Sequence, residues 1–523
     1  MDIYEEIIEK FMTNREKTLE SLAKIKRETA KKHKISSPSN VELIQVYHKL
    51  VKNKTIQKNP LLEQILRKRK IRSLSGVVVV SVLTKPYPCP EKCIYCPEEK
   101  GLPKSYLSGE PAVERAKRNK FNPYLQVKDR IKSLEIQGHP TDKIELRIIG
   151  ASFSNYPKKY QEWFVKECFR AANDFSKKTK IKLNLEKEQK KNEKAKHRIV
   201  GISVETRPDL IDKKEILYLR KLGVTLVELG VQTIYDEILK FCQRGHTLEK
   251  TIQATEFLKN AGFKIMYQIM PNLPGSDLKK DFLMAKEIFA NPDFKPDWLK
   301  IYPCLVCKNT KLYQLWKQGE YQPHTDKELI ELLIKIKEIL PYWVRMARLF
   351  RDIPAEKIEA GSKISNIRQV IQKKMAQRGK TCHCIRCREI RERYDPQEKV
   401  HLFRQDYNAS QGREIFLSYE NKQRTKLYSM LRLRIQKEKG LYPAMIRELH
   451  TFGQMAAVAQ KSLSPQHKGL GKKLMKEAER ITQKEFKVKK IAVISGVGVR
   501  GYYRKLGYGL KNTYMIKYLE QGR

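Results

Sequence analysis

The sequence feature that most constrains the fold is an alternation of short apolar segments with helix-like segments between residues 76 and 345. The apolar segments are GVVVVSVLT (76–84), KIELRIIG (143–150), HRIVGISVE (197–205), LVELGVQ (226–232), FKIMYQIM (263–270) and WLKIYP (298–303). Continuous apolar strands that alternate with helices are typical of buried parallel strands in βαβ units. About six such units predict a full or partial (β/α) barrel, in which loops at the C-terminal ends of the strands carry the chemistry.

The regions on either side of this alternation have different patterns. Residues 1–75 are basic and carry apolar residues at helical spacing, which predicts a helical region. The lysine-rich segment 176–198 lacks a core pattern and is interpreted as a solvated insertion with a marginal helix. Residues 346–400 are densely basic, whereas residues 401–523 combine strand-like segments with one long helix. We therefore expect an α/β multidomain protein.

The charge balance favours nucleic acid as a partner. The 523 residues include 107 Lys and Arg against 59 Asp and Glu, which gives a formal net charge of +48. Basic side chains that neutralise phosphates release counterions and thereby gain affinity. A generic basic cytosolic protein is the alternative interpretation.

The sequence favours a cytoplasmic location. No apolar run approaches the roughly 20 residues of a membrane span, and the N-terminal MDIYEEIIEKFM lacks the apolar core of a signal peptide. Ten cysteines in a cytosolic chain of this length indicate metal binding rather than a disulfide scaffold. We expect no membrane contact.

Three cysteines follow the first apolar segment in PYPCPEKCIYCP (86–97). Cys89, Cys93 and Cys96 have the spacing Cys-x3-Cys-x2-Cys, which can hold three irons of a [4Fe–4S] cluster. The fourth iron is then open, and in radical S-adenosylmethionine (SAM) enzymes SAM binds there. The alternative interpretations are a zinc knuckle that lacks a fourth ligand, and chance; the barrel context favours the cluster.

Two other strand ends are weaker candidates for SAM contacts. The small residues of GASF (150–153) permit close approach of a ligand to the backbone. Glu205, in SVETRPD (203–209), offers a carboxylate to the amine or ribose of SAM. Both segments also fit ordinary loop ends.

A second thiol cluster lies in the basic region, where Cys382, Cys384 and Cys387 form Cys-x-Cys-x2-Cys. Zinc is the favoured interpretation, with a fourth ligand from His383, His401, water or substrate, and free surface thiols are the alternative. Cys304 and Cys307 form a further Cys-x2-Cys, but with no third partner nearby they are interpreted as packing residues.

The motif QHKGLG (466–471) stands between a strand-like segment and the long helix near the C-terminus. Glycines at a helix start let backbone N–H groups face a pyrophosphate. Gln-x-x-Gly-x-Gly in this context is the acetyl-CoA site of GNAT acetyltransferases. The following VISGVGVRGYYRKLGY (493–508) contains tyrosines, among them Tyr503, which either contact the CoA or acyl group or belong to the core.

The combination of a radical SAM pattern and a GNAT pattern resembles the catalytic subunit family of Elongator, over residues 66 to 520. The motifs that carry the resemblance occur in family order and include RSLSGVVVVSVLTKPYPCP, PKSYLSGEPAVERAKRNKFNPYLQ, ISVETRPD, RGHT, MPNLPG, LKIYPCLV, FRDIPA, TCHCIRCREI, QHKGLGKKLMKEAERI and AVISGVGVRGYYRKLGY. The family's Gly-Gly-Thr-Phe reads Gly-Ala-Ser-Phe here, and HTFGQMAAVAQ is looser than the equivalent family loop.

The resemblance implies modification of the wobble uridine (position 34) of tRNA. Acetyl-CoA and SAM would yield a carboxymethyl group at C5: a 5′-deoxyadenosyl radical takes hydrogen from the acetyl methyl, the carbon radical adds to C5, and the thioester is hydrolysed. The implied partners are the tRNA anticodon stem-loop, SAM, acetyl-CoA and a reductant protein, with self-association as a further expectation. Two functional alternatives are a protein lysine acetyltransferase with a structural cluster, and a non-catalytic tRNA-binding scaffold.

The resemblance also assigns domains and residues. The domains would be a basic helical tRNA-binding region (1–75), a radical SAM (β/α) barrel (76–345), a basic zinc-binding linker (346–400) and a GNAT domain (401–523). The implied catalytic residues are Lys143 and Tyr503, and the zinc ligands are the three linker cysteines. The implied acetyl-CoA residues are Lys143, Glu448, Leu449, His450, Thr451, Gln466, Gly469, Leu470, Gly471, Lys472 and Tyr503.

Overall fold

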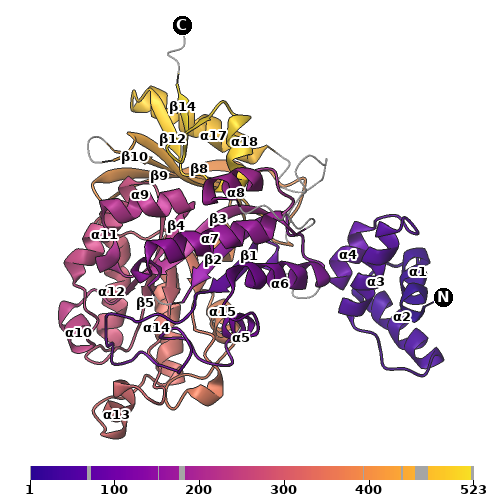
Figure 1. The fold of residues 1–523 in the computed structure, drawn as a ribbon, viewed down its shortest axis with the longest axis horizontal. Coiled ribbons are helices and arrows are strands. Elements are labelled where there is room, and N and C mark those ends of the chain that lie inside the picture. Colours follow the sequence, from indigo (N-terminus) through magenta and orange to yellow (C-terminus); the bar gives the residue numbers. More distant parts are fainter. Residues whose placement is uncertain are drawn as a thin grey trace.

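The computed structural model describes residues 2–67, 72–150, 152–175, 183–392, 394–436, 440–453 and 469–519. Figure 1 shows a small helical lobe at the N-terminus, beside a larger body that contains two sheets. Within these ranges, no helix combines the length and the apolar character that crossing a membrane requires.

The N-terminal lobe consists of four helices, α1 (Ile3–Thr13), α2 (Leu19–Lys32), α3 (Asn40–Lys52) and α4 (Pro60–Leu66). Thr18 and Ser39 form capping boxes at the starts of α2 and α3. Each side chain accepts a hydrogen bond from the backbone N–H at position N3, and the N3 side chain accepts one from the backbone N–H of the N-cap residue. Buried Ile7, Phe11 and Tyr47 form the core of this lobe. It meets the body where Arg67 Nε donates to the carbonyl of Gly138 at 2.8 Å.

The first sheet contains seven parallel strands in sequence order. The strands are β1 (Val78–Leu83), β2 (Lys143–Ile149), β3 (Arg198–Thr206), β4 (Leu226–Gln232), β5 (Lys264–Ile269), β6 (Trp298–Ile301) and β7 (Arg345–Arg348). Because β1 and β7 do not pair with each other, the sheet is a half-barrel, which confirms the predicted partial barrel. The sequence pattern identifies β1 to β6 but not β7, which extends the sheet past residue 345.

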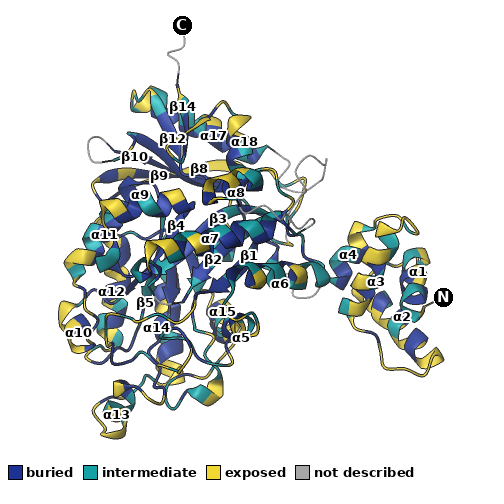
Figure 2. Ribbon diagram, viewed as in Figure 1, coloured by how far each residue is buried: buried dark blue, intermediate teal, exposed yellow. Residues whose placement is uncertain are grey.

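Helices cover the outer face of the half-barrel, as Figure 2 shows by their buried inner and exposed outer sides. The helices between β1 and β8 are α5 (Pro111–Arg118), α6 (Pro123–Ile136), α7 (Lys158–Asn173), α8 (Leu185–Asn192), α9 (Lys213–Leu222), α10 (Asp236–Phe241), α11 (Leu248–Asn260), α12 (Leu278–Ala290), α13 (Lys311–Lys317), α14 (Asp326–Glu338), α15 (Ile367–Gln377) and α16 (Ile385–Arg388). Among them, α13 projects from the bottom of the body in Figure 1 and does not cover the sheet. The helices leave the concave side of the sheet for functional groups.

The lysine-rich segment is not the solvated insertion that its composition predicts. Residues 176–182 lie outside the described part, but the next residues form α8, which packs against α7. Asn192 is fully buried, and its side chain accepts from the Ile199 N–H at 2.8 Å and donates to the His197 carbonyl at 3.0 Å. Polar side chains therefore satisfy the backbone at the start of β3. Because these buried residues are polar, the sequence of the segment shows no apolar periodicity.

The second sheet is mixed, with the strand order β13-β14-β12-β11-β10-β9-β8. Its strands are β8 (His401–Ala409), β9 (Gly412–Glu420), β10 (Leu427–Ile435), β11 (Ala444–Thr451), β12 (Lys490–Val493), β13 (Gly509–Lys511) and β14 (Tyr514–Tyr518). Only β11 and β12 run parallel to each other. Helix α17 (Leu470–Arg480), the π-helical turn Ile481–Glu485, the 3-10 turn Val497–Val499 and α18 (Arg500–Arg504) complete this domain. The α/β multidomain expectation is confirmed.

Candidate functional site

The first candidate site lies at the C-terminal end of the half-barrel, where the loop after β1 carries Cys89, Cys93 and Cys96. The loop is fixed by backbone hydrogen bonds from Ile94 N–H to the Cys242 carbonyl at 3.2 Å and from Leu312 N–H to the Ile94 carbonyl at 2.9 Å. All three cysteines are free and line one cavity of about 610 Å³. The structure therefore brings the predicted cluster ligands together.

The surroundings of these cysteines suit a cluster better than a single ion. The only His, Cys, Asp and Glu ligand atoms in the described ranges that gather within 4.8 Å as a group of three or more belong to other cysteines. In a four-iron cluster each thiolate ligates a different iron, so its sulfur atoms stand apart. Burial raises the pKa of the Cys96 thiol to about 11, so the charge of bound iron is needed to stabilise the thiolate.

Arg244 is a positive group beside the Cys93 sulfur. Its Nη1 lies 3.8 Å from the Cys93 sulfur, and its Nη2 donates to the Gly230 carbonyl at 2.7 Å. Burial opposes the charge of Arg244, but Tyr95 and Cys93 outweigh that effect and raise its pKa. Arg244 therefore stays charged beside the cysteines and stabilises an anionic ligand set there.

Glu205, predicted as a SAM contact, lies in β3 and lines the same cavity as the cysteines. Its carboxylate accepts from Tyr106 Oη at 2.7 Å and from Gln268 Nε2 at 3.2 Å, and it lies 3.5 Å from Lys300 Nζ. The carboxylate is thus held in place by protein groups at the cavity wall. Ser152 of the GASF segment lines the cavity too, whereas residue 151 lies outside the described part.

The linker cysteines form a compact second cluster. The sulfur atoms of Cys382, Cys384 and Cys387 all lie within 4.8 Å of one another, and Lys337 Nζ lies 3.5 Å from the Cys387 sulfur. Neither predicted histidine ligand joins this group: the His383 ring stacks on Tyr342, with 4.6 Å between centroids, and His401 is exposed on β8. Cys304 and Cys307 are buried apolar neighbours, as predicted.

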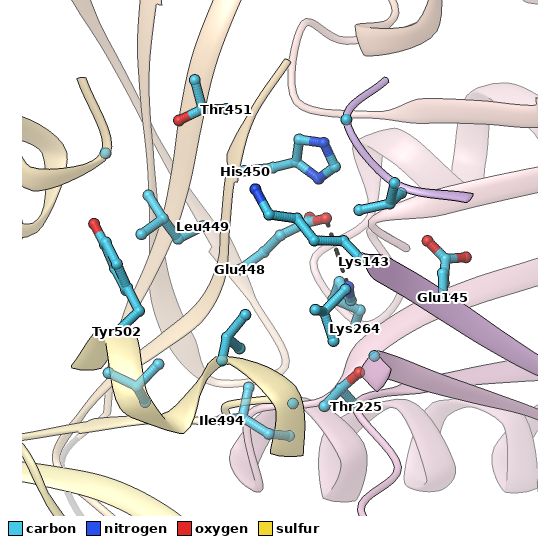
Figure 3. Close-up of a pocket in the computed structure, with 18 of the residues that line it drawn as sticks. Lys143, Glu145, Thr225, Lys264, Glu448, Leu449, His450, Thr451, Ile494 and Tyr502 are labelled. Atoms are coloured by element: carbon cyan, nitrogen blue, oxygen red, sulfur yellow. Dashed lines mark ion pairs between the residues drawn. The ribbon is translucent and has the colours of Figure 1, made fainter. Parts of the chain in front are cut away.

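A second cavity, of about 470 Å³, lies between the N-terminal ends of the barrel strands and the second sheet. Figure 3 shows Lys143 of β2 reaching toward Glu448 and His450 of β11. The predicted residues on its wall are Lys143, Glu448, Leu449, His450, Thr451, Gly469, Gly471, Lys472 and Tyr503. The structure thus gathers residues from segments more than 300 positions apart, as the resemblance implies.

Of the two remaining predicted acetyl-CoA residues, one is not on this wall and the other lies outside the described residues. The Leu470 side chain is 3% exposed and belongs to the apolar core, so only its backbone is available to a ligand. Gln466 lies outside the described residues. Tyr503 is buried against Tyr508 and also lines the cavity, so it packs in the core, while its contact with CoA or the acyl group stays a prediction.

The start of α17 is shaped to admit a ligand backbone. Gly469 is the N-cap with φ of +72°, a conformation that favours glycine, and a Cβ placed there meets no atom within 4 Å. A Cβ on Gly471 would lie 3.2 Å from Tyr502 Oη and 3.5 Å from Thr451 Oγ1. These two glycines keep the helix N-terminus open toward the cavity, where its backbone N–H groups suit a pyrophosphate.

Several lining residues escaped the sequence analysis. Lys264, at the start of β5, lies 3.7 Å from Glu448 across the two domains, as the dashed line in Figure 3 marks. Lys143, which the resemblance does imply, has a pKa that is lowered by burial and, to a smaller extent, by Arg198. Burial also raises the pKa of Tyr502, to about 12. Single lysines and tyrosines carry no sequence signal, because only the packing of the two sheets places them here.

A third cavity, of about 440 Å³, lies at the open seam between the edge strands β1 and β7. We call it the seam cavity. It shares Glu145, Glu448 and His450 with the second cavity, which we call the α17 cavity. It shares Arg147 and Arg348 with the cavity lined by Cys89, Cys93 and Cys96, which we call the cysteine cavity. Its wall contains seven arginines, Arg72, Arg130, Arg147, Arg345, Arg348, Arg368 and Arg386, against three acidic residues, Glu145, Asp352 and Glu448. The three cavities therefore adjoin in series through a strongly basic chamber.

Comparisons with known proteins agree with this arrangement. The Radical SAM superfamily model matches residues 87–284, and the Radical_SAM C-terminal domain model matches residues 296–377. The chain is 47% identical to the tRNA uridine(34) acetyltransferase of Methanocaldococcus jannaschii, over 99% of this chain and 97% of that protein. It is 36% identical to human Elongator complex protein 3, over 95% of this chain and 93% of that protein.

A solved structure gives the same result. The N-terminally truncated Elp3 of Methanocaldococcus infernus is 46% identical, with a TM-score of 0.75 over 86% of this chain and all of that one. Identity at this level across nearly the whole chain covers both sheets and all three cavities. The chain belongs to the radical SAM family of tRNA uridine(34) acetyltransferases that includes Elongator complex protein 3.

Proposed function

We propose that this protein is a tRNA uridine(34) acetyltransferase that builds a carboxymethyl group at C5 of the wobble base from acetyl-CoA, with SAM as the radical source. The observation that carries the proposal is the series of adjoining cavities. The cysteine cavity and the α17 cavity lie at opposite ends of the half-barrel strands, and the seam cavity shares wall residues with both. An acetyl group and a radical source held at the two ends have a common chamber in which to meet the base.

Cys89, Cys93 and Cys96 would hold the [4Fe–4S] cluster, and their free thiols on one cavity wall fit that group. When bound, the cluster with SAM supplies a 5′-deoxyadenosyl radical. The chain's own groups orient the site: Arg244 stabilises negative charge near Cys93, and Glu205 offers a fixed carboxylate on the wall of the same cavity. Formation of that radical also needs one electron from an external reductant.

The second domain is proposed to be a GNAT acetyltransferase domain that holds acetyl-CoA. The sheet is antiparallel except for one pair of neighbouring parallel strands, β11 and β12, which lies beside the N-terminus of α17. Residues 469–472 would bind the pyrophosphate there, and β11 would line the pantetheine arm. Lys143 and Tyr503 both line this cavity, and the thioester would lie beside them.

The seam cavity is proposed to receive the tRNA. Arg130, Arg368 and Arg386 line it without an acidic partner in the described ranges, and burial lowers the pKa of Arg130 to about 10. Phosphates of an anticodon loop compensate such charges, and a splayed base fits a protein chamber. A basic chamber repels a lysine side chain, which argues against a protein lysine acetyltransferase. The basic N-terminal lobe would extend the tRNA surface.

The linker cysteines are proposed to bind zinc. Two thiolates at Zn–S distances of 2.3 Å in a tetrahedral site lie about 3.8 Å apart, which the three sulfur atoms within 4.8 Å of one another accommodate. Such a site would fix the backbone of residues 382–387 and thereby the place of Arg386 of α16 on the wall of the seam cavity.

One assay tests the function. Anaerobically reconstituted protein is incubated with tRNA, SAM, acetyl-CoA and a reductant, and the nucleosides are analysed by mass spectrometry. We expect C5-carboxymethyluridine only when all components are present, together with 5′-deoxyadenosine. Acetyl-lysine on a protein substrate without modified uridine would refute the proposal.

A further inference from the structure

His450 occupies the junction of two cavities, because it lines both the α17 cavity and the seam cavity. Its Nε2 lies 2.7 Å from the backbone carbonyl oxygen of Ser75. A carbonyl oxygen can only accept, so Nε2 must carry the proton. The neutral ring then has its lone pair on Nδ1, for which the described residues offer no hydrogen-bond partner.

The ring is held rigidly at this junction. It stacks on Phe452 with 4.3 Å between centroids and 23° between planes. With one face on Phe452 and Nε2 fixed by the Ser75 carbonyl, the imidazole has one polar atom left to use. A group held in one tautomer and one orientation is arranged as a general base needs to be.

The charged groups around His450 keep the ring neutral. Burial lowers its pKa; the Ser75 carbonyl and Glu448 oppose that change, and Arg345 of β7 and Lys264 of β5 add to it. Lys143 and Glu145 of β2 line the same cavity. The neutral, base-competent form therefore dominates at neutral pH.

We propose that His450 is the general base that activates water for hydrolysis of the CoA thioester once the acetyl carbon has bonded to the uridine. The proposal rests on the function proposed above and assigns its last step to this residue. His450 stands where the acetyl end of CoA would pass from the α17 cavity into the seam cavity, which is where the tRNA-linked thioester would lie.

The step balances without any oxidant or reductant. Nδ1 takes a proton from water as the water oxygen bonds to the thioester carbon. The ammonium of Lys143, on the same cavity wall, stabilises the developing oxyanion. The C–S bond then breaks with its electron pair on sulfur, the proton on Nδ1 passes to the thiolate, and a carboxylic acid and free CoA remain.

The main test is His450→Gln, whose side-chain N–H can still donate to the Ser75 carbonyl but whose oxygen is not basic. In single turnover we expect 5′-deoxyadenosine and the C–C bond to form, and the tRNA–CoA thioester to accumulate because its hydrolysis slows about 100-fold or more. Added hydroxylamine should convert that adduct to a nucleoside hydroxamate visible by mass spectrometry. Hydrolysis of the thioester adduct by His450→Gln at the wild-type rate would overturn the proposal.

His450→Phe is the matched control, because it keeps the stacking and removes both nitrogen functions. It should also accumulate adduct; if it alone does so, the Ser75 contact matters and the base role is refuted. Melting temperatures of both variants with and without acetyl-CoA separate unfolding from a defect in the chemistry.

A measurement on the unmodified protein stands apart from any variant. The hydrolysis rate of the adduct should rise with pH and level off, with the midpoint of the rise below pH 6.5, the ordinary His value, because the pKa of His450 is lowered. A rate that keeps rising tenfold per unit to pH 8 would indicate hydroxide attack and overturn the proposal. If the unmodified protein forms no 5′-deoxyadenosine-dependent adduct or product at all, the proposed function fails instead.

Discussion

Asp297, before β6 of the half-barrel, and Arg447, in β11 of the second sheet, form a fully buried ion pair with 2.5 Å between Arg447 Nη2 and Asp297 Oδ2. Arg447 also pairs with Glu414 at 2.8 Å and donates to the Phe263 carbonyl at 2.6 Å. The interface between the two domains therefore contains buried charges that are stabilised by ion pairing with one another. This contact sets the position of β11, and hence of Glu448 and His450, against the barrel.

Arg447→Met should destabilise the fold by about 3–5 kcal/mol, because it leaves Asp297 and Glu414 buried with fewer positive partners. Urea unfolding measures the change. Arg480→Met is the control, since its pair with Glu477 lies at the surface and should be worth less than about 1 kcal/mol. Equal effects of the two changes would contradict the importance of the buried pair.

The same pair predicts acid sensitivity. Burial alone would raise the pKa of Asp297, but Arg447, Lys259 and Arg432 outweigh it and hold the pKa well below its usual range. A depressed carboxylate pKa gives stability that is present above the unfolded value of about 3.9 and is lost as pH falls toward the folded value. The unfolding free energy should thus fall below pH 4, and Asp297→Asn should flatten that dependence. An unchanged acid limb in the variant would contradict this.

The half-barrel could be predicted because β1 to β6 lie in short apolar segments that alternate with helix-like segments. Strand β7 could not, because Arg345–Arg348 reads RMAR and lacks an apolar run. Arg345 is buried by an ion pair and an aromatic contact: it pairs with Glu389 at 2.7 Å and lies over the Trp298 ring at 5.2 Å. Charged residues that are buried only by tertiary partners give no hydropathy signal.

The site divides in the same way. The cysteine and glycine motifs are local, so their spacing, together with the neighbouring strands and helix, predicted Cys89, Cys93, Cys96, Gly469 and Gly471 as site residues. The seam cavity has no local motif, since its walls come from segments before β1, around β7, in α16 and in β11. No sequence period connects such segments, and only the folded chain brings them together.

Cys96→Ala should abolish cluster assembly and SAM cleavage while leaving tRNA affinity nearly unchanged, because the arginines of the seam cavity are untouched. Iron content, 5′-deoxyadenosine and tRNA binding are measured on the same preparation. Cys242→Ala is the matched control, because this buried cysteine packs in the same apolar cluster without belonging to the Cys-x3-Cys-x2-Cys motif. Equal loss of tRNA binding and SAM cleavage in Cys96→Ala would mean that the loop is structural.

Gly471→Val should weaken acetyl-CoA binding at least tenfold, because a Cβ there already lies 3.2 Å from Tyr502 Oη and further methyl groups would narrow the cavity. Calorimetric titration with acetyl-CoA measures the change. Gly501→Ala in α18 is the control, since a Cβ at Gly501 meets no atom within 4 Å. An unchanged affinity in Gly471→Val would place the pyrophosphate elsewhere.

Replacement of seam arginines should weaken tRNA binding without changing acetyl-CoA affinity. Arg130→Gln and Arg368→Gln each remove a charge that faces the seam cavity without an acidic partner in the described ranges. For every phosphate that a variant no longer neutralises, the slope of log K against log salt should become shallower by about 0.7–0.9. Arg378→Gln, whose partner Glu331 is on the surface, is the matched control and should leave the slope unchanged. The decisive quantity is the slope rather than the affinity at one salt concentration, because a general loss of stability lowers the affinity without removing a specific number of phosphate contacts. If both seam variants keep the slope of log K against log salt that the unmodified protein has, the tRNA backbone does not enter this cavity.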